Sequence, residues 1–146
     1  MKITHTIIIM FLSSFIIQYF LMPAIMVNKY SYITNSLGKV YMSIIMGLFM
    51  VLIEVMMHDH QYSVFSSYWY ISLFLMLGIF TYLYRKQTYI DDKQYIEGMI
   101  EHHSMALLTS EEILKKTDNY ETAKLAKNII QNQTDELKFM KKLVNK

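Results

Sequence analysis

Two adjacent histidines, His102 and His103, lie close to two methionines, Met99 and Met105, in a segment with helical character. Imidazole and thioether are borderline-to-soft ligands, which suit copper, above all Cu(I), better than magnesium or calcium. The chain of 146 residues contains no cysteine, so a soft-metal site has to be built from methionine and histidine. Copper binding is therefore the first chemistry that these residues indicate.

The two histidines belong to the first of two predicted amphipathic helices. Apolar or small residues recur at helical spacing over residues 96–114, after acidic residues 91–92 that suit a helix N-terminus. Residues 117–119 have the composition of a turn, and a second helix is predicted over about residues 120–144. We predict that residues 89–146 form a soluble antiparallel helical hairpin, with no strand.

Polar and thioether residues interrupt the apolar faces of both predicted helices. A turn at about Asp118 would bring His103 opposite Gln133, and Met99 close to Glu136 and Met140. We expect Met99, His102 and His103 to face the bundle. The candidate metal ligands are Met99, His102, His103, Gln133, Glu136 and Met140.

Other residues of this segment are expected to take no part in the site. Met105 is predicted to point away from the hairpin, and Glu101 is predicted to lie off the apolar stripe. One alternative stays open for His103 itself. It is a buried histidine whose hydrogen bonds are satisfied by Gln133 or Glu136, with no metal present.

The hydropathy of the chain divides it into a membrane half and a soluble half. Of its 26 formally charged residues, 21 lie from Arg85 onward. We predict a membrane domain over residues 1–86, with transmembrane helices at about residues 6–27, 40–57 and 68–84. The competing interpretation of the first helix is a cleaved signal peptide; its length favours a retained span.

The second span carries a stripe of residues spaced four apart. Residues four apart lie nearly above one another on a helix, so three thioethers, a carboxylate and an imidazole share one slanting line. This pattern indicates a soft-metal path through the membrane, although methionine is also an adaptable packing residue. An acid within a span is costly unless it is functional or paired. The stripe consists of Met42, Met46, Met50, Glu54 and His58.

The positions of the basic residues outside the predicted spans indicate the membrane sidedness. With the N-terminus outside, Lys29, Lys39, Arg85 and Lys86 are cytoplasmic and only Lys2 is not. The positive-inside rule then places the C-terminal hairpin in the cytoplasm of a three-span cell-membrane protein.

Composition and motifs argue against several other functions. The net charge of +2 and the absence of a basic stripe argue against nucleic-acid binding. We find no nucleophile–base constellation, phosphate loop or dinucleotide fingerprint, so we expect neither an enzyme nor an organic cofactor. Two helices alone make a poor core, so we expect a homodimer in which two hairpins form a four-helix bundle.

The C-terminal half resembles the domain of unknown function 305 family. The resemblance rests on Met99-Ile100-Glu101-His102-His103-Ser104-Met105-Ala106 and on the segment Ala126–Met140, which follow the pattern Met-Ile-x-His-His-x-x-Ala and Ala-x-x-Ile-Ile-x-x-Gln-x-x-Glu-Ile-x-x-Met. Glu101 stands where the family often has proline, and Leu137 replaces isoleucine. The resemblance implies a ferritin-like four-helix bundle and copper binding through methionine and histidine. It also implies an extracytoplasmic domain, against the charge count.

These observations favour a membrane-anchored protein that binds or hands on copper. The alternative is a structural or assembly protein whose hairpin is a dimerisation module with no metal. A ferritin-like di-iron oxidoreductase is disfavoured, because di-iron bundles use inward-facing Glu-x-x-His motifs that this tail lacks.

Overall fold

A computed structural model describes residues 3–144, and it confirms the all-helical prediction. No strand is present in this range. The elements, in chain order, are α1 (Ile3–Ile16), η1 (Ile17–Leu21), α2 (Met22–Met26), η2 (Tyr30–Tyr32), α3 (Leu37–Tyr62), α4 (Ser67–Arg85), α5 (Asp92–Leu114) and α6 (Tyr120–Val144).

Three helical segments are long and apolar enough to cross a membrane, as the sequence predicts. They are Ile3–Met26, Leu37–Tyr62 and Ser67–Arg85, with 24, 26 and 19 residues. At 1.5 Å per residue, each has roughly the length needed to cross about 30 Å of hydrocarbon. The first two begin three residues before the predicted start of each span, because helical hydrogen bonding continues into the flanking polar residues.

The first of these segments is not a uniform α-helix. A π-helical turn, η1, separates α1 from α2, and Pro23 is the second residue of α2. Proline has no N–H to donate, and its ring clashes with the carbonyl four residues earlier, so it disturbs the α-helical hydrogen bonds of the preceding turn. The wider turn keeps the helix continuous across this disturbance.

The chain divides into two compact units. The first contains α1, η1, α3 and α4, and the second contains the segment Met22–Leu37 together with α5 and α6. The predicted boundary at residues 86–89 lies next to Ile90, where the second segment of the second unit begins. Residues 22–37, which the sequence assigns to the membrane half, pack with the C-terminal helices instead.

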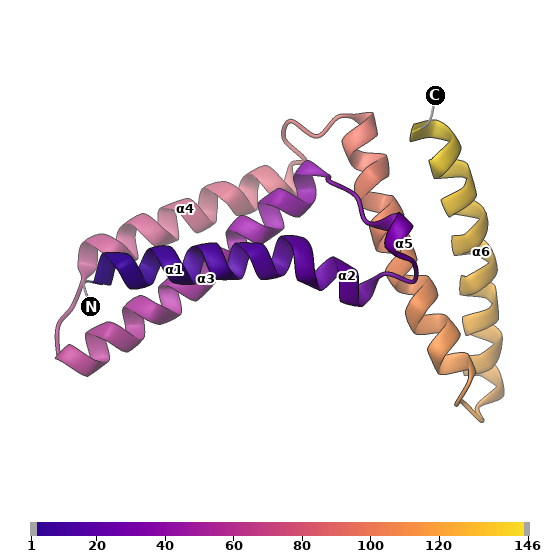
Figure 1. The fold of residues 1–146 in the computed structure, drawn as a ribbon, viewed down its shortest axis with the longest axis horizontal. Coiled ribbons are helices and arrows are strands. Elements are labelled where there is room, and N and C mark those ends of the chain that lie inside the picture. Colours follow the sequence, from indigo (N-terminus) through magenta and orange to yellow (C-terminus); the bar gives the residue numbers. More distant parts are fainter. Residues whose placement is uncertain (1–2, 145–146) are drawn as a thin grey trace. The chain divides into compact units, whose positions relative to one another are not determined.

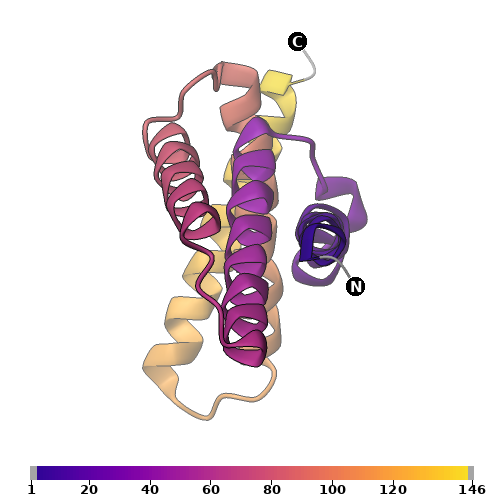
Figure 2. The same ribbon diagram turned by 90° about the vertical axis from the view of Figure 1, so that its left-hand side faces the viewer.

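The first unit is built around α3. Figure 2 shows α4 and α1 on either side of it, and the apolar core joins side chains from all three helices. Gly47 allows α1 to approach closely, since a Cβ there would come within 2.8 Å of the Phe11 ring. The buried residues of this core are Ile7, Ile45, Leu48, Val51, Val55, Leu73 and Leu77.

The second unit is built on α5 and α6, which run side by side in opposite directions and are joined by residues 115–119 (Figure 1). Their shared core consists of Ile100, Leu107 and Leu137, and Leu137 is only 1% exposed. The Asp91 side chain caps α5 by accepting a hydrogen bond from the backbone N–H of Gln94 at 2.8 Å.

Candidate functional site

His103 and Glu136 are the candidate ligands that the structure brings together. The Nδ1 atom of His103 on α5 lies 3.0 Å from an Oε atom of Glu136 on α6. The histidine side chain is 14% exposed and the glutamate side chain 56% exposed. The pair therefore lies at the rim of the α5–α6 contact, with the imidazole turned inward and the carboxylate reaching it from the surface.

The short distance between these atoms is not a well-formed hydrogen bond. The Nδ1 atom of His103 is buried, and no hydrogen-bond partner is correctly aligned with it, Glu136 included. A buried polar atom without a partner costs free energy, so such an atom calls for an explanation. Two ligands bound at about 2.0–2.2 Å to one tetrahedral metal ion lie about 3.3–3.6 Å apart. The His103 and Glu136 side chains would therefore separate by a few tenths of an ångström to hold such an ion.

The helix register differs from the prediction. His103 faces Glu136, three residues beyond the predicted partner Gln133. The register is set by Leu137, which packs against Ile100 and Leu107, and not by the position of the turn. In an antiparallel pair with this offset, Met99 lies level with Met140, and both side chains are half-buried.

The predicted orientations of His102 and Met105 are wrong. His102 is exposed, whereas Met105 is half-buried. The prediction counted only one buried face on α5, the face toward α6. The helix has a second buried face, and Met105 lies near it, one turn after the buried residue Glu101.

The second buried face of α5 is covered by the segment 28–36, and sequence reasoning missed it. Glu101, predicted to lie off the apolar stripe, is only 7% exposed, and its carboxylate accepts a hydrogen bond from the Thr34 backbone N–H at 3.0 Å. The Ser104 hydroxyl, fully buried, accepts one from the Asn28 backbone N–H at 2.9 Å. The Asn28 side-chain amide also donates to Glu111 at 2.6 Å.

A sequence pattern could have revealed this face. Glu97, Glu101, Ser104 and Glu111 recur at intervals of four, three and seven residues, which places them on one side of a helix. Their partners lie at least 63 residues earlier in the chain, so the pattern alone could not identify what covers them.

The described residues contain no cluster of histidine and carboxylate side chains that could hold a metal alone. Within residues 3–144, no group of three or more His, Asp and Glu side chains is placed to bind one ion. A site at His103 and Glu136 therefore needs thioether ligands or a residue from outside the chain.

The methionine stripe of α3 lies at the margin of the first unit's core. Met42 packs against that core, Met46 is 39% exposed, and Met50 and Glu54 are half-buried. No contact shown by these side chains distinguishes a metal path from ordinary packing, so the path stays a prediction.

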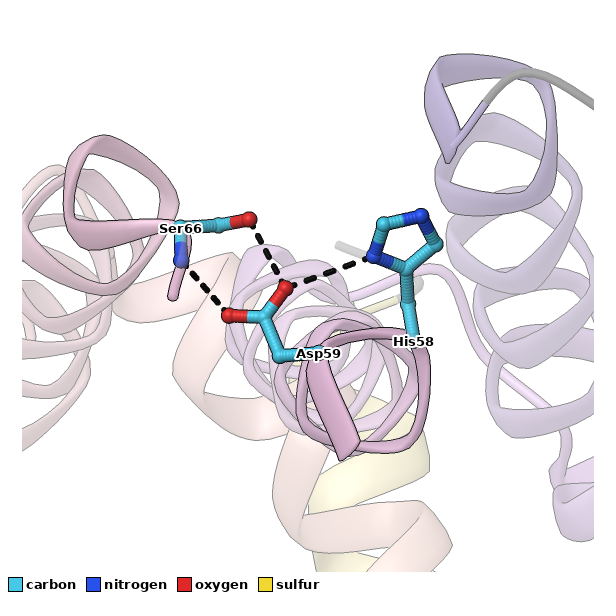
Figure 3. A network of polar contacts seen from close by, with 3 residues as sticks. All are labelled: His58, Asp59 and Ser66. Carbon is cyan, nitrogen blue, oxygen red and sulfur yellow. Dashed lines mark hydrogen bonds and ion pairs between the residues drawn. The ribbon is translucent and has the colours of Figure 1, made fainter. Parts of the chain in front are cut away.

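The carboxyl-terminal end of this stripe is a polar network (Figure 3). The buried Asp59 carboxylate accepts hydrogen bonds from the Ser66 backbone N–H at 2.6 Å and from the Ser66 hydroxyl at 2.8 Å. The Nδ1 atom of His58 lies 3.3 Å from the same carboxylate. Asp59 thus fixes the loop between α3 and α4 and accepts a hydrogen bond from the backbone N–H of Ser66, the residue that precedes α4. These contacts describe a structural role for Asp59.

Comparisons with known proteins assign similarity to both halves of the chain. A family model described as a domain of unknown function (DUF305) matches residues 83–145. The uncharacterized protein L153 of Acanthamoeba polyphaga mimivirus is 31% identical over 140 residues, which cover 95% of this chain and 91% of that protein. No solved structure matches the chain.

Proposed function

The chain belongs to the DUF305 family, and from that premise we propose that it is a membrane-anchored protein that binds copper through its C-terminal helical hairpin. The similarity to the mimivirus protein extends through the membrane-span half, so the proposal concerns the two halves together. The three apolar helices anchor the protein in the cell membrane, with the lipid bilayer as their partner.

One observation carries the proposal: the buried Nδ1 atom of His103 lacks an aligned hydrogen bond although it lies 3.0 Å from a Glu136 oxygen. A cation between an imidazole nitrogen and a carboxylate oxygen would satisfy both. Neutral imidazole binds a metal without first losing a proton, so the site would work at neutral pH without a thiolate.

Thioethers favour copper over other metals at this position. Met99 and Met140 lie level with each other, one helical turn from the His103–Glu136 pair, and both are half-buried. Thioether ligands select Cu(I) among the common metals. Bound Cu(I) would supply a positive charge that ties α5 to α6 and can be passed on by ligand exchange. Gln133 and the exposed His102 are the outer candidates.

A competition titration of the full chain in detergent micelles tests this proposal. We expect His103→Ala and Met140→Ala each to weaken Cu(I) binding about tenfold or more against a chromogenic chelator. His5→Ala, which removes an exposed imidazole from α1, is the matched control and should leave the affinity unchanged. Equal affinity in the His103→Ala variant and the unmodified chain would overturn the site. Elemental analysis of protein isolated from its native membrane identifies the metal.

The alternative proposal is an assembly module with no metal. It is favoured by the apolar core between α5 and α6, beside which a His103–Glu136 ion pair would fix the register of the two helices. In that case His103→Ala lowers the melting temperature equally with and without a chelator. A melting temperature that copper raises only when His103 is present excludes the alternative.

A further inference from the structure

The pair of helices α5 and α6 has two sides, and the chain covers one of them. The segment 28–36 lies on this side, where Thr34 and Asn28 bond to α5 and the Lys141 ammonium of α6 lies 4.0 Å above the Tyr32 ring. Glu101 and Lys141 mark this side on the two helices.

The other side, here called the open face, has a stripe of apolar and polar residues on each helix. Each stripe repeats at intervals of three and four residues, which places its members on one helix face. Glu136 belongs to the α6 stripe and touches His103, which lies four residues after Met99 of the α5 stripe, so the two stripes flank the same seam. The stripes are Tyr95, Met99, His102, Ala106, Thr109 and Ile113 on α5, and Leu125, Ile129, Asn132, Glu136, Phe139 and Leu143 on α6.

The open face exposes large apolar side chains. Leu125 is 60% exposed, Phe139 62% and Tyr95 55%. Neither stripe contains a lysine or arginine, although eight lysines lie elsewhere on residues 91–144. Exposed apolar side chains on stripes that contain no lysine or arginine are typical of a protein interface and not of a surface that binds anionic lipid.

The size and charges of the open face fit a second copy of this chain. Helices of 23 and 25 residues are about 35 Å long, and a pair 8–10 Å apart is about 20 Å wide, so the face offers about 700 Å². A specific interface needs about 800 Å² of accessible surface from each partner, and side-chain relief brings this face to that size. Its single acid, Glu136, and its imidazole, His102, are complementary, so a twofold axis would form both His102–Glu136 contacts at once.

We propose that the open face binds a second copy of this chain and that His102 of the partner subunit completes the His103–Glu136 site. Among the described residues of one chain, this site has two ligands of the histidine and carboxylate type, and the exposed His102 sits on the face that the partner covers. The dimer stands independently of the metal, whereas the completion of the site by His102 rests on the proposed copper function.

The oligomeric state of the full chain in detergent, by light scattering after size exclusion, tests the interface. We expect a dimer that Phe139→Asp converts to a monomer, because the substitution weakens association at least tenfold. Lys127→Asp adds an acid to an exposed position of α6 outside the stripe and should leave the dimer intact. If circular dichroism shows that Phe139→Asp loses helicity, Leu125→Asp replaces it as the variant that tests the interface. A monomeric wild-type chain, or a dimer that the decisive variant leaves unchanged, overturns the interface.

Mixed dimers test whether the site is shared. One subunit carries His102→Ala and the other His103→Ala, and two affinity tags isolate the mixed species. If the histidines act across the interface, the mixed dimer keeps one intact site and binds one Cu(I) with wild-type affinity, while both homodimers bind at least tenfold more weakly. If they act within one chain, the mixed dimer has no intact site, and the shared site is overturned. A wild-type dimer that binds no Cu(I) refutes the proposed function and the shared site but leaves the interface standing.

Discussion

Replacement of Glu101 by alanine should release the segment 28–36 from α5. The buried Glu101 carboxylate accepts a hydrogen bond from the Thr34 backbone N–H at 3.0 Å. The Thr34 hydroxyl lies 3.4 Å from the same oxygen but has a shorter bond, 2.8 Å, to the backbone carbonyl of Glu97. The backbone N–H is therefore the contact that the substitution removes in full.

The size of the effect follows from this one contact. A hydrogen bond to a charged group contributes about 1.5–3 kcal/mol, and a buried donor left without a partner costs about 1–3 kcal/mol. The two figures describe overlapping parts of one loss, so we expect local opening of the segment to become easier by about 2–3 kcal/mol. At 1.4 kcal/mol per factor of ten, this raises the exchange rate of the Thr34 amide by about 30- to 150-fold.

Hydrogen–deuterium exchange of the full chain in detergent, read by mass spectrometry on peptides that contain Thr34, measures this rate. Glu97→Ala is the matched control, because it lies one turn earlier on the same face and keeps its backbone carbonyl bond to Thr34. Peptides from α6 report whether the whole unit has opened. Unchanged exchange at Thr34 in Glu101→Ala, or an equal increase in Glu97→Ala, would refute the reasoning.

Three further predictions concern packing, the loop of Figure 3 and membrane sidedness. Leu137→Ala should destabilise the second unit by about 3–5 kcal/mol, because Leu137 is 1% exposed between α5 and α6. Lys127→Ala, at an exposed position of α6 outside the open face, should cost under about 0.5 kcal/mol, and denaturant unfolding compares the two variants. Asp59→Ala should speed chymotrypsin cleavage after Tyr62 or Phe65 by about tenfold, because the Ser66 backbone N–H loses its acceptor. The control Asp118→Ala, in the exposed connection between α5 and α6, should leave the rate of this cleavage unchanged. Since the chain has no cysteine, Tyr30→Cys, Ser63→Cys and Asp118→Cys can each be labelled at a single position with a membrane-impermeant maleimide. Tyr30→Cys and Asp118→Cys should react from one side of the membrane and Ser63→Cys from the other. Labelling of all three variants from one side would contradict three spans.

Local pattern determined most of the fold. Helical periodicity depends only on residues three and four apart, and hydropathy depends only on composition within one span, so the sequence alone identified every long helix and all three spans. The Asp91 cap and the turn between α5 and α6 were likewise local. Even the polar stripe of Glu97, Glu101, Ser104 and Glu111 was present in the sequence as a pattern without a partner.

The tertiary structure decided which of these residues meet. His103 faces Glu136 and not Gln133, because Leu137 packs against Ile100 and Leu107 and so fixes how the two helices slide past each other. Such sliding changes no local propensity, so no local pattern can specify it. Glu101 is buried for a similar reason: its partner Thr34 is 67 residues away in the chain, and only the folded chain brings the segment 28–36 onto α5. The same contact leaves the opposite side of α5 uncovered, with His102 exposed on it.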